Sequence, residues 1–253
     1  MDLHEAVNVC LLAIYYRHVP GAPIVLAANR DESRRRPSLS PDLREDQRLL
    51  CGLDAQAGGT WLGVNADGLV VAVTNRPAPP APAVARSRGL LAMDLLHTGS
   101  ASKAVELAMR ELDTEHYAGV NYLCTDAQSC AVVCGGLQPQ VIDMPPGLHL
   151  LTNGDPDDVD DSRQKISRRL MVEREPSRVE DFLNRAKLVF SGKAHPPTAA
   201  KMVLNQPWRG TISSTIIAIT DDPHQAAYLY ADGPPDSEPY CDYSHMLRAM
   251  LAR

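Results

Sequence analysis

Aromatic side chains are scarce in this sequence. Phe, Trp and Tyr together make up 5% of the 253 residues, and the formal net charge at pH 7 is −6. Proteins that bind nucleic acids need basic side chains against the phosphates, and those that bind single strands also use aromatic stacking. The sequence has no run in which basic and aromatic residues are interleaved. We therefore expect no nucleic-acid partner.

Long apolar runs are also missing. No stretch approaches the ~18 apolar residues that indicate a transmembrane helix. Met1–Ala6 lacks the basic and apolar segments of a secretory signal. Cysteines in a chain without an export signal are typical of reduced thiols in the cytosol. We expect a cytoplasmic protein with no membrane span, in which the thiols stay reduced; the six cysteines are Cys10, Cys51, Cys124, Cys130, Cys134 and Cys241.

Several familiar motifs are absent as well. The sequence contains no G-x-S-x-G elbow, no P-loop and no H-E-x-x-H zinc motif. The acidic stretch Asp155–Asp161 lacks the glycine and glutamate spacing of a calcium loop. Cys130 and Cys134 have no His pair with which to complete a zinc site. We expect no metal site, and we interpret the acidic stretch as a solvated loop that caps a helix with Asp161 or Ser162.

The apolar pattern that is present predicts an α+β protein. Short β-type runs come first, then helical periodicity, then strands, helices and strands again. This order fits two sheets between helix layers, or a single α+β sheet. We find no repeat and no linker, so residues 1–253 form one domain, with 1–9 as a possible propeptide or N-terminal extension. The predicted helices are Arg88–His97, Ser102–Leu112, Ser162–Glu173, Val179–Phe190 and Tyr243–Arg253.

Polar residues stand where three of the predicted strands end. Asn29–Glu32 follows the run Ile24–Ala28, while Asn75 and Asn153 each close a later apolar run. Any one of them alone is an ordinary turn residue. Three of them, together with Cys10 in the first predicted strand, indicate one site at a shared sheet edge. Cys10 itself is either a small buried residue or a nucleophile.

Seven short segments give the chain a family resemblance. The sequence resembles the NRDE family, also called the transport and Golgi organisation protein 2 family. The segments occur in the family's order and span roughly residues 8 to 232. They are N-V-C-L-L around Cys10, A-N-R-D-E with the later Arg36-Pro37, G-G-T-W-L-G-V from Gly58, V-T-N-R from Val73, S-R-G from Ser87, L-T-N from Leu151 and S-S-T-I-I from Ser213.

The resemblance implies an N-terminal-nucleophile hydrolase type of fold, a four-layer αββα sandwich of two antiparallel sheets. Distant relatives of that type hydrolyse bile-salt and penicillin amides with a cysteine freed as the first residue. The implied roles are Cys10 as nucleophile with its own α-amine as base, Arg30 holding the thiolate, Asp31 orienting the amine, and Asn75 and Asn153 donating to the oxyanion. The motif residues Asn29, Glu32, Trp61 and Arg76 are expected to line the same site.

Two features of this chain depart from the family pattern. Relatives usually begin Met-Cys, whereas nine residues precede Cys10 here. An acylated nitrogen has no usable lone pair, so the amine mechanism requires that residues 1–9 be removed. Where relatives often carry an arginine before the S-S-T segment, this chain has Ile212, and Arg209 would face the other side of a strand.

Two functions follow from the resemblance. The first is a hydrolase on non-peptide linear amide C–N bonds or on thioesters, with Cys10 as the nucleophile and no required cofactor. The second is a non-catalytic protein that binds and traffics haem, lipid or acyl-coenzyme A in the same cleft. Met93, Met109, His97 or Cys10 could ligate haem iron, although no haem motif is present. Either way the partner is a small molecule, and removal of residues 1–9 discriminates between the two functions.

Overall fold

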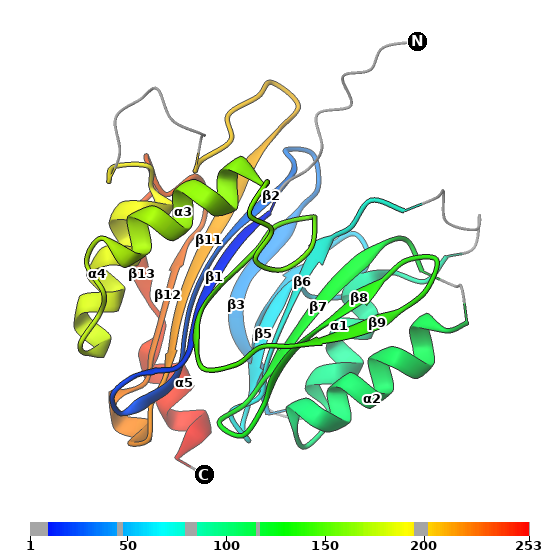
Figure 1. The fold of residues 1–253 in the computed structure, drawn as a ribbon, viewed down its shortest axis with the longest axis horizontal. Coiled ribbons are helices and arrows are strands. Elements are labelled where there is room, and N and C mark those ends of the chain that lie inside the picture. The colour runs from blue at the N-terminus through cyan, green and yellow to red at the C-terminus, as the bar shows by residue number, and fades with distance from the viewer. Residues whose placement is uncertain (1–9, 45–47, 79–84, 115–116, 195–201, 253) are drawn as a thin grey trace.

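The computed structural model describes residues 10–44, 48–78, 85–114, 117–194 and 202–252. Two antiparallel sheets lie face to face, and helices cover the outer face of each sheet (Figure 1). The predicted four-layer αββα sandwich is therefore confirmed, and the alternative of a single sheet is wrong. An apolar sheet face must pack against another layer, and here each sheet packs against the other sheet on one face and against helices on the opposite face.

The first sheet carries the segment that contains the NRDE residues. Its strand order among the described residues is β10-β1-β2-β11-β12-β13, so β2 lies between β1 and β11. β2 is the longest strand of this sheet, and it pairs along most of its length with β11. The strands are β1 (Leu11–Val19), β2 (Ala22–Ser33), β10 (Gly147–Leu151), β11 (Arg209–Ile219), β12 (Ala227–Ala231) and β13 (Cys241–Asp242).

The second sheet is a meander in which neighbours in sequence are neighbours in space. Each strand pairs antiparallel with the next, from β3 to β9. Short connections join most of these neighbours, whereas the chain between β6 and β7 contains two helices. The strands are β3 (Ser38–Arg44), β4 (Leu49–Asp54), β5 (Leu62–Asn65), β6 (Val70–Asn75), β7 (Val120–Thr125), β8 (Cys130–Gly135) and β9 (Gln140–Asp143).

Two pairs of helices form the outer layers. α1 (Arg88–Leu96) and α2 (Ala101–Leu112) pack on the second sheet, while α3 (Ser162–Val172) and α4 (Val179–Phe190) pack on the first. α5 (Ser244–Leu251) lies against β12, next to the short 3₁₀ turn η2 (Pro223–Gln225). None of the helices that the structure describes combines the length and the apolar character needed to cross a bilayer.

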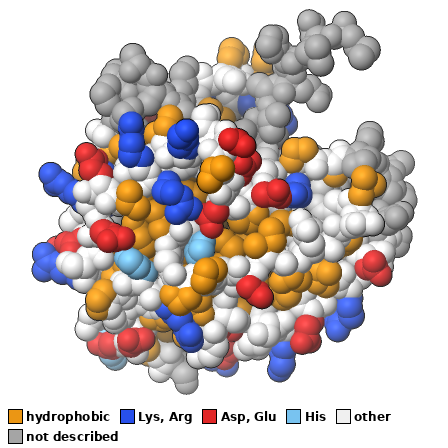
Figure 2. Space-filling model, in the orientation of Figure 1, with side chains coloured by type: hydrophobic (Ala, Val, Ile, Leu, Met, Phe, Trp, Pro, Cys, Tyr) orange, Lys and Arg blue, Asp and Glu red, His pale blue; other side chains and the backbone are white. Residues whose placement is uncertain are grey.

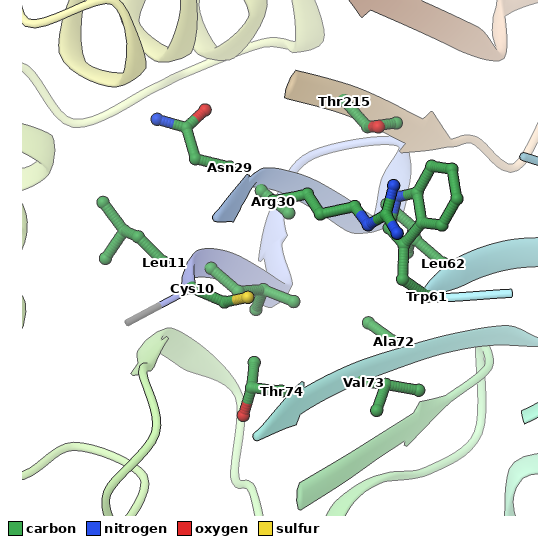
Figure 3. A pocket seen from close by; sticks show the side chains of 12 residues that line it. Cys10, Leu11, Asn29, Arg30, Trp61, Leu62, Ala72, Val73, Thr74 and Thr215 are labelled. Carbon is green, nitrogen blue, oxygen red and sulfur yellow. The ribbon is translucent and has the colours of Figure 1, made fainter. Parts of the chain in front are cut away.

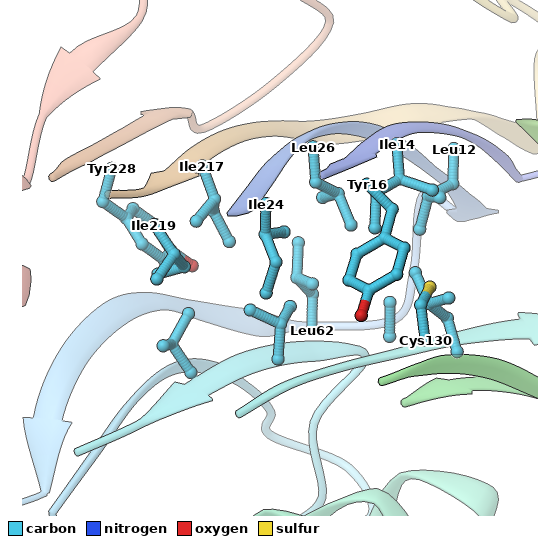
Figure 4. Packing of buried hydrophobic residues seen from close by; sticks show 14 of the residues in the cluster. Leu12, Ile14, Tyr16, Ile24, Leu26, Leu62, Cys130, Ile217, Ile219 and Tyr228 are labelled. Atoms are coloured by element: carbon cyan, nitrogen blue, oxygen red, sulfur yellow. The ribbon is translucent and has the colours of Figure 1, made fainter. Parts of the chain in front are cut away.

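The main core lies between the two sheets. Alternate residues of β1 and β2 point toward the second sheet, among them Leu12, Ile14, Ile24 and Leu26, and they meet Leu62 of β5 (Figure 4). All five are at most 2% exposed. The residues between them in the sequence face α3 and α4, as the period of two in a strand requires. The site described below lies at one end of this core, where β1, β2, β5 and β6 meet.

The structure corrects one prediction about β2. Asn29–Glu32 does not follow the strand but forms its continuation, paired with β11 through Asn29↔Ser214 and Arg30↔Ser213. Consecutive residues of this segment therefore face opposite sides of the sheet. After the strand, Arg34 and Arg35 are exposed, and Arg36 forms an ion pair with Asp54.

Candidate active site

Cys10 lies directly before β1, and its side chain is half-buried. Its sulfur points into the space between Arg30 on β2 and the side chains of Val73 and Thr74 on β6 (Figure 3). That space opens into a cleft of about 270 Å³, which we call the Cys10 cleft. Its lining residues are Cys10, Arg30, Asp31, Glu32, Arg36, Asp54, Ala57, Thr60, Trp61, Val73, Asn75, Ala85, Arg86, Ser87, Arg88, Gly89 and Ala118.

Burial of Cys10 favours the protonated thiol over the thiolate. Burial raises the pKa of Cys10 to about 11, and the negative charge of Asp31 adds to the effect. The sulfur lies 3.9 Å from the backbone oxygen of Asp31, to which the S–H can donate a weak hydrogen bond. The role expected of Arg30, to hold Cys10 as a thiolate, stays a prediction.

Arg30 packs on an aromatic ring inside the cleft. Its guanidinium carbon lies 3.8 Å from the centroid of the Trp61 ring, a distance at which cation–π attraction is strong. The Trp61 ring also lies against Gly52, where an added Cβ would come within 2.6 Å of the ring. Gly52 therefore leaves room for the indole, and the indole in turn fixes the arginine.

Asp31 is held by two partners that the sequence did not reveal. Arg163 of α3 donates from Nη1 to Oδ2 at 2.7 Å, and Thr211 of β11 donates from Oγ1 to Oδ1 at 2.5 Å. Burial nevertheless leaves the pKa of Asp31 above its usual value. Ile212 lies where the β2–β11 register shifts. Where relatives often have an arginine, this chain thus has a strand irregularity, and the cation beside Asp31 comes from α3.

The two asparagines occupy different positions. Asn75 at the end of β6 lines the Cys10 cleft, whereas Asn153 is buried beyond β10 and does not line it. The Oδ1 atom of Asn153 has no hydrogen-bond partner among the described residues. Thr74 donates to the backbone oxygen of Thr152 at 2.7 Å, and Asn121 donates to that of Gly154 at 3.0 Å. These bonds hold the Asn153 segment against β6.

Two of the four expected binding residues lie outside the Cys10 cleft. Asn29 faces the helix layer, where its amide donates to the backbone oxygens of Phe190 and Met202, both at 2.9 Å. Arg76 forms an ion pair with Asp155 beyond the end of β6. Both residues therefore brace neighbouring segments. The other two, Glu32 and Trp61, line the Cys10 cleft together with Cys10, Arg30, Asp31 and Asn75.

The glycines of two motifs bring the N-terminus of α1 to the Cys10 cleft. Thr60 donates its backbone N–H to the backbone oxygen of Gly89 at 3.0 Å. A Cβ on Gly59 would lie 2.1 Å from the carbonyl carbon of Gly89, so the two backbones touch where no side chain fits. This contact explains why G-G-T-W and S-R-G both belong to the site. It also places Arg88 in the lining, which the sequence analysis did not single out.

The described lining does not form a haem or metal site. Cys10 is the one side chain in the described lining that could ligate haem iron, and its burial favours the protonated thiol. Met93 and His97 of α1 face other groups: the Met93 sulfur lies 3.9 Å from the Cys51 sulfur, and His97 bonds the Met93 backbone oxygen. No group of three potential metal ligands gathers among the described residues. We derive no step through haem.

Comparison with known proteins identifies the family. The model of the family described as Transport and Golgi organisation 2 matches residues 9–230. The Transport and Golgi organization 2 homolog of Mus musculus is 35% identical over 141 residues, covering 51% of this chain and 50% of the relative. The Homo sapiens homolog is 34% identical over 139 residues, with the same coverage. The matched segment thus spans about half the length of these relatives.

Two solved structures share the fold. The Caenorhabditis elegans ortholog of N-acylethanolamine-hydrolyzing acid amidase superposes with a TM-score of 0.55 at 11% identity, covering 82% of this chain and 92% of that one. A mutant conjugated bile acid hydrolase from Clostridium perfringens gives a TM-score of 0.55 at 10% identity, covering 93% of both chains. At this identity the likeness concerns the fold alone. With its sequence match over residues 9–230, the chain belongs to the Transport and Golgi organisation 2 family.

Proposed function

We propose that the protein is a cysteine hydrolase that cleaves a linear amide or a thioester, with Cys10 as the nucleophile. The observation that carries this proposal is the position of the Cys10 sulfur, which faces a cleft shared with Arg30, Asp31 and Asn75. Two hydrolases that act on amides, by the names they carry, have the same fold. Their activities belong to those proteins, and we extend the reaction type to this chain as a proposal.

The proposed reaction has two stages, acylation of Cys10 and hydrolysis of the acyl-enzyme. The Cys10 sulfur attacks the carbonyl carbon, its proton passes to the base, and a C–S bond forms. The C–N or C–S bond of the substrate then breaks, and the leaving group takes the proton from that base. Water attacks the acyl-enzyme, releases the carboxylic acid and restores the thiol. A free α-amine on Cys10 has an unperturbed pKa of about 7.7–8, which suits a base at neutral pH.

The side chains around Cys10 supply the remaining parts. The amide group of Asn75 lines the cleft and can donate to the developing oxyanion, a contact worth about 3 kcal/mol in comparable sites. Asn153 is a second candidate donor from the segment held against β6. The backbone oxygen of Asp31 lies 3.9 Å from the Cys10 sulfur, and the charge of its carboxylate acts on Cys10. Asp31 is therefore the candidate group for orienting the amine.

Because the pKa of Cys10 is raised, the proposed hydrolysis depends on removal of residues 1–9. A thiol with a pKa of about 11 is almost entirely protonated at pH 7 and is a poor nucleophile without a base. Removal of residues 1–9 would place that base on Cys10 itself. The proposal therefore requires Cys10 to become the first residue of the active chain.

The test begins with the intact mass of the purified full-length protein. We expect a loss that corresponds to residues 1–9. The processed protein should then hydrolyse chromogenic amides or acyl thioesters, and Cys10→Ser should lower kcat/KM by about 10³-fold or more. Cys241→Ser is the matched control, because Cys241 is exposed and far along the chain, and it should leave the rate unchanged. A chain that keeps residues 1–9 and shows no Cys10-dependent hydrolysis would contradict the proposal.

A second candidate function is binding without cleavage. The observation that favours it is the burial of Cys10, which disfavours the thiolate. In this case the Cys10 cleft holds a lipid or acyl-coenzyme A for trafficking, and Cys10 is a packing residue. A trafficking role has no support beyond the family name, and haem finds no set of ligands in the described cleft. The cytoplasmic location expected from the sequence is part of either version of the proposal.

A further inference from the structure

Arginine side chains are concentrated in the Cys10 cleft, although the net charge of the whole protein is negative. Four arginines and three carboxylates line it, although the formal net charge of the protein is −6. On the face shown in Figure 2, by contrast, described acidic and basic side chains are intermixed. The lining arginines are Arg30, Arg36, Arg86 and Arg88, and the carboxylates are Asp31, Glu32 and Asp54.

Several of these charges neutralise one another or are neutralised from outside the cleft. Arg36 donates to Asp54 from Nε at 2.9 Å and from Nη2 at 2.5 Å. Arg86 pairs with Asp94 of α1 at 2.7 Å. Asp31, as described above, is occupied by Arg163. Glu32 lies 4.0 Å from Arg36, and its charge also acts on Arg30 and Arg88. Arg30 and Arg88 are the two lining cations that have no ion-pair partner within 4.0 Å among the described residues.

Arg30 is a buried cation without an ion-pair partner in the described part of the chain. It is 8% exposed, and its Nη1 atom has no hydrogen-bond partner among the described residues. Burial lowers its pKa. A buried guanidinium with an unused donor costs free energy, and a bound oxyanion would recover it through a charge-assisted hydrogen bond. The Trp61 ring holds the guanidinium at the wall of the cleft.

Arg88 presents a second cation in the same lining. Its Nη1 donates to the backbone oxygen of Gly119 at 2.9 Å, and none of the described carboxylates lies within ion-pair distance of it. Burial lowers the pKa of Arg88, as it does for Arg30. The Gly119 bond fixes the direction of the side chain and leaves its other nitrogens for a ligand.

The N-terminus of α1 adds a third source of positive potential. Ser87, Arg88 and Gly89 all line the cleft, and Arg88 and Gly89 begin the helix. The Ser87 hydroxyl makes no capping bond in the described structure, and the first turn contains no acidic residue. A helix N-terminus has unsatisfied N–H groups and a positive partial charge, and anions satisfy both.

We propose that Arg30, Arg88 and the N-terminus of α1 form an oxyanion subsite, so that the ligand of the Cys10 cleft carries a carboxylate or a phosphate group. The proposal rests on the proposed function for the choice of cleft, and it narrows the substrate class to anionic amides or thioesters. Binding to the subsite does not require hydrolysis. The subsite can therefore be tested separately.

The test is a titration of the full-length protein with two simple anions. Inorganic phosphate and butyrate are added to a Trp208→Phe background, so that fluorescence reports on Trp61 alone. At low salt we expect at least one of the two anions to bind, and raising NaCl from about 0.05 to about 0.5 M should weaken binding. Binding of phosphate alone indicates a phosphorylated ligand, and binding of butyrate alone indicates a carboxylate. Binding of neither would overturn the proposal.

Substitutions locate the bound anion. Arg88→Gln removes one cation from a half-buried position without opening the core, and we expect it to weaken binding by about tenfold or more. Arg30→Lys keeps the charge while losing the planar stack on Trp61, and it should weaken binding less than Arg88→Gln. Arg110→Gln on α2, outside the lining, is the control and should leave binding unchanged. Equal affinity in Arg88→Gln and the parent protein would overturn the proposal.

The subsite and the hydrolase can fail independently. If Cys10→Ser still binds the anion while no hydrolysis is found in the parent protein, the result supports the subsite and contradicts the proposed reaction. If the parent protein hydrolyses neutral amides through Cys10 and binds neither anion, the reaction stands and the subsite falls.

Discussion

At the scale of single residues, the site depends on which face of β2 each side chain takes. Arg30 points between the sheets to Trp61, whereas its neighbours Asn29 and Asp31 point to the helix layer, where they meet Phe190 and Arg163. The sequence identified Cys10, Arg30, Asp31 and Trp61 through motifs. It could not identify Arg163, because that contact joins residues 132 positions apart and no local pattern marks it.

The buried pair of Asp31 and Arg163 leads to a prediction about stability. The two side chains are 2% and 8% exposed. Arg163→Met leaves the Asp31 carboxylate buried with one partner fewer, so the free energy of unfolding should fall by about 3–5 kcal/mol. The measurement is urea unfolding at pH 7. Asp31→Asn in addition to Arg163→Met should recover part of the loss, because the isolated charge is then gone.

The control for this prediction is a pair on the surface. Arg178 and Asp181 form an ion pair at 3.2 Å, with Arg178 70% exposed. Arg178→Met should leave the free energy of unfolding almost unchanged, since water screens such pairs. Equal losses in Arg163→Met and Arg178→Met would mean that Arg163 contributes no more than a surface charge.

At the scale of elements, the sequence predicted the helices more closely than the strands. The predicted Val179–Phe190 coincides with α4, because an amphipathic helix reveals its period over three turns. β3 was not predicted, since polar residues and a proline interrupt its sequence, and the short apolar run of β4 was missed as well. The extension of β2 through Glu32 was missed because this part of the strand consists of polar and charged residues, which do not show the apolar alternation of a strand.

The contact between the Gly58–Thr60 loop and α1 is the second prediction at this scale. Gly59→Ala would bring a Cβ within 2.4 Å of backbone atoms of Gly89 and Leu90, which cannot rotate away. We expect the free energy of unfolding to fall by about 1–3 kcal/mol or more, as overpacking does elsewhere. Anion binding should weaken with it, since α1 must move away from the Cys10 cleft. Denaturant unfolding and the phosphate titration measure the two effects.

Gly136→Ala is the matched control, because no atom lies within 4 Å of a Cβ at Gly136. It should change neither stability nor anion binding by a measurable amount. A Gly59→Ala protein as stable as Gly136→Ala would show that the close approach of the two backbones is not required.

At the scale of the whole molecule, stability should depend on the ionisation of His149. This buried residue of β10 has an acceptor at each ring nitrogen: the Asp157 carboxylate lies 2.6 Å from Nδ1 and the Pro145 backbone oxygen lies 2.6 Å from Nε2. Neither acceptor can donate, so both nitrogens must carry protons. Burial alone would lower the pKa of His149, but these two bonds outweigh it and raise the pKa above 6.5.

The direction of the pH dependence follows from that raised pKa. The stabilisation is complete below the unfolded value of 6.5 and is lost as the pH rises through the folded value. The pKa of Asp157 is lowered from 3.8 because its bonds to His149 and to the Leu150 N–H outweigh its burial, so its contribution is lost only in acid. The free energy of unfolding should therefore fall between pH ~6 and ~8.

His149→Gln isolates this contribution, because it removes the titrating group and keeps a polar side chain. At pH ~5.5 we expect the variant to be less stable than the parent by about 1.5–3 kcal/mol, the usual worth of hydrogen bonds to a charged group. The difference should shrink as the pH rises through the pKa of His149 in the folded protein, where the parent loses its proton. The measurement is urea unfolding of both proteins across this range. Parallel pH profiles would mean that His149 is neutral when folded, and one of its two short contacts would then have to be broken, because no neutral tautomer can donate to both acceptors.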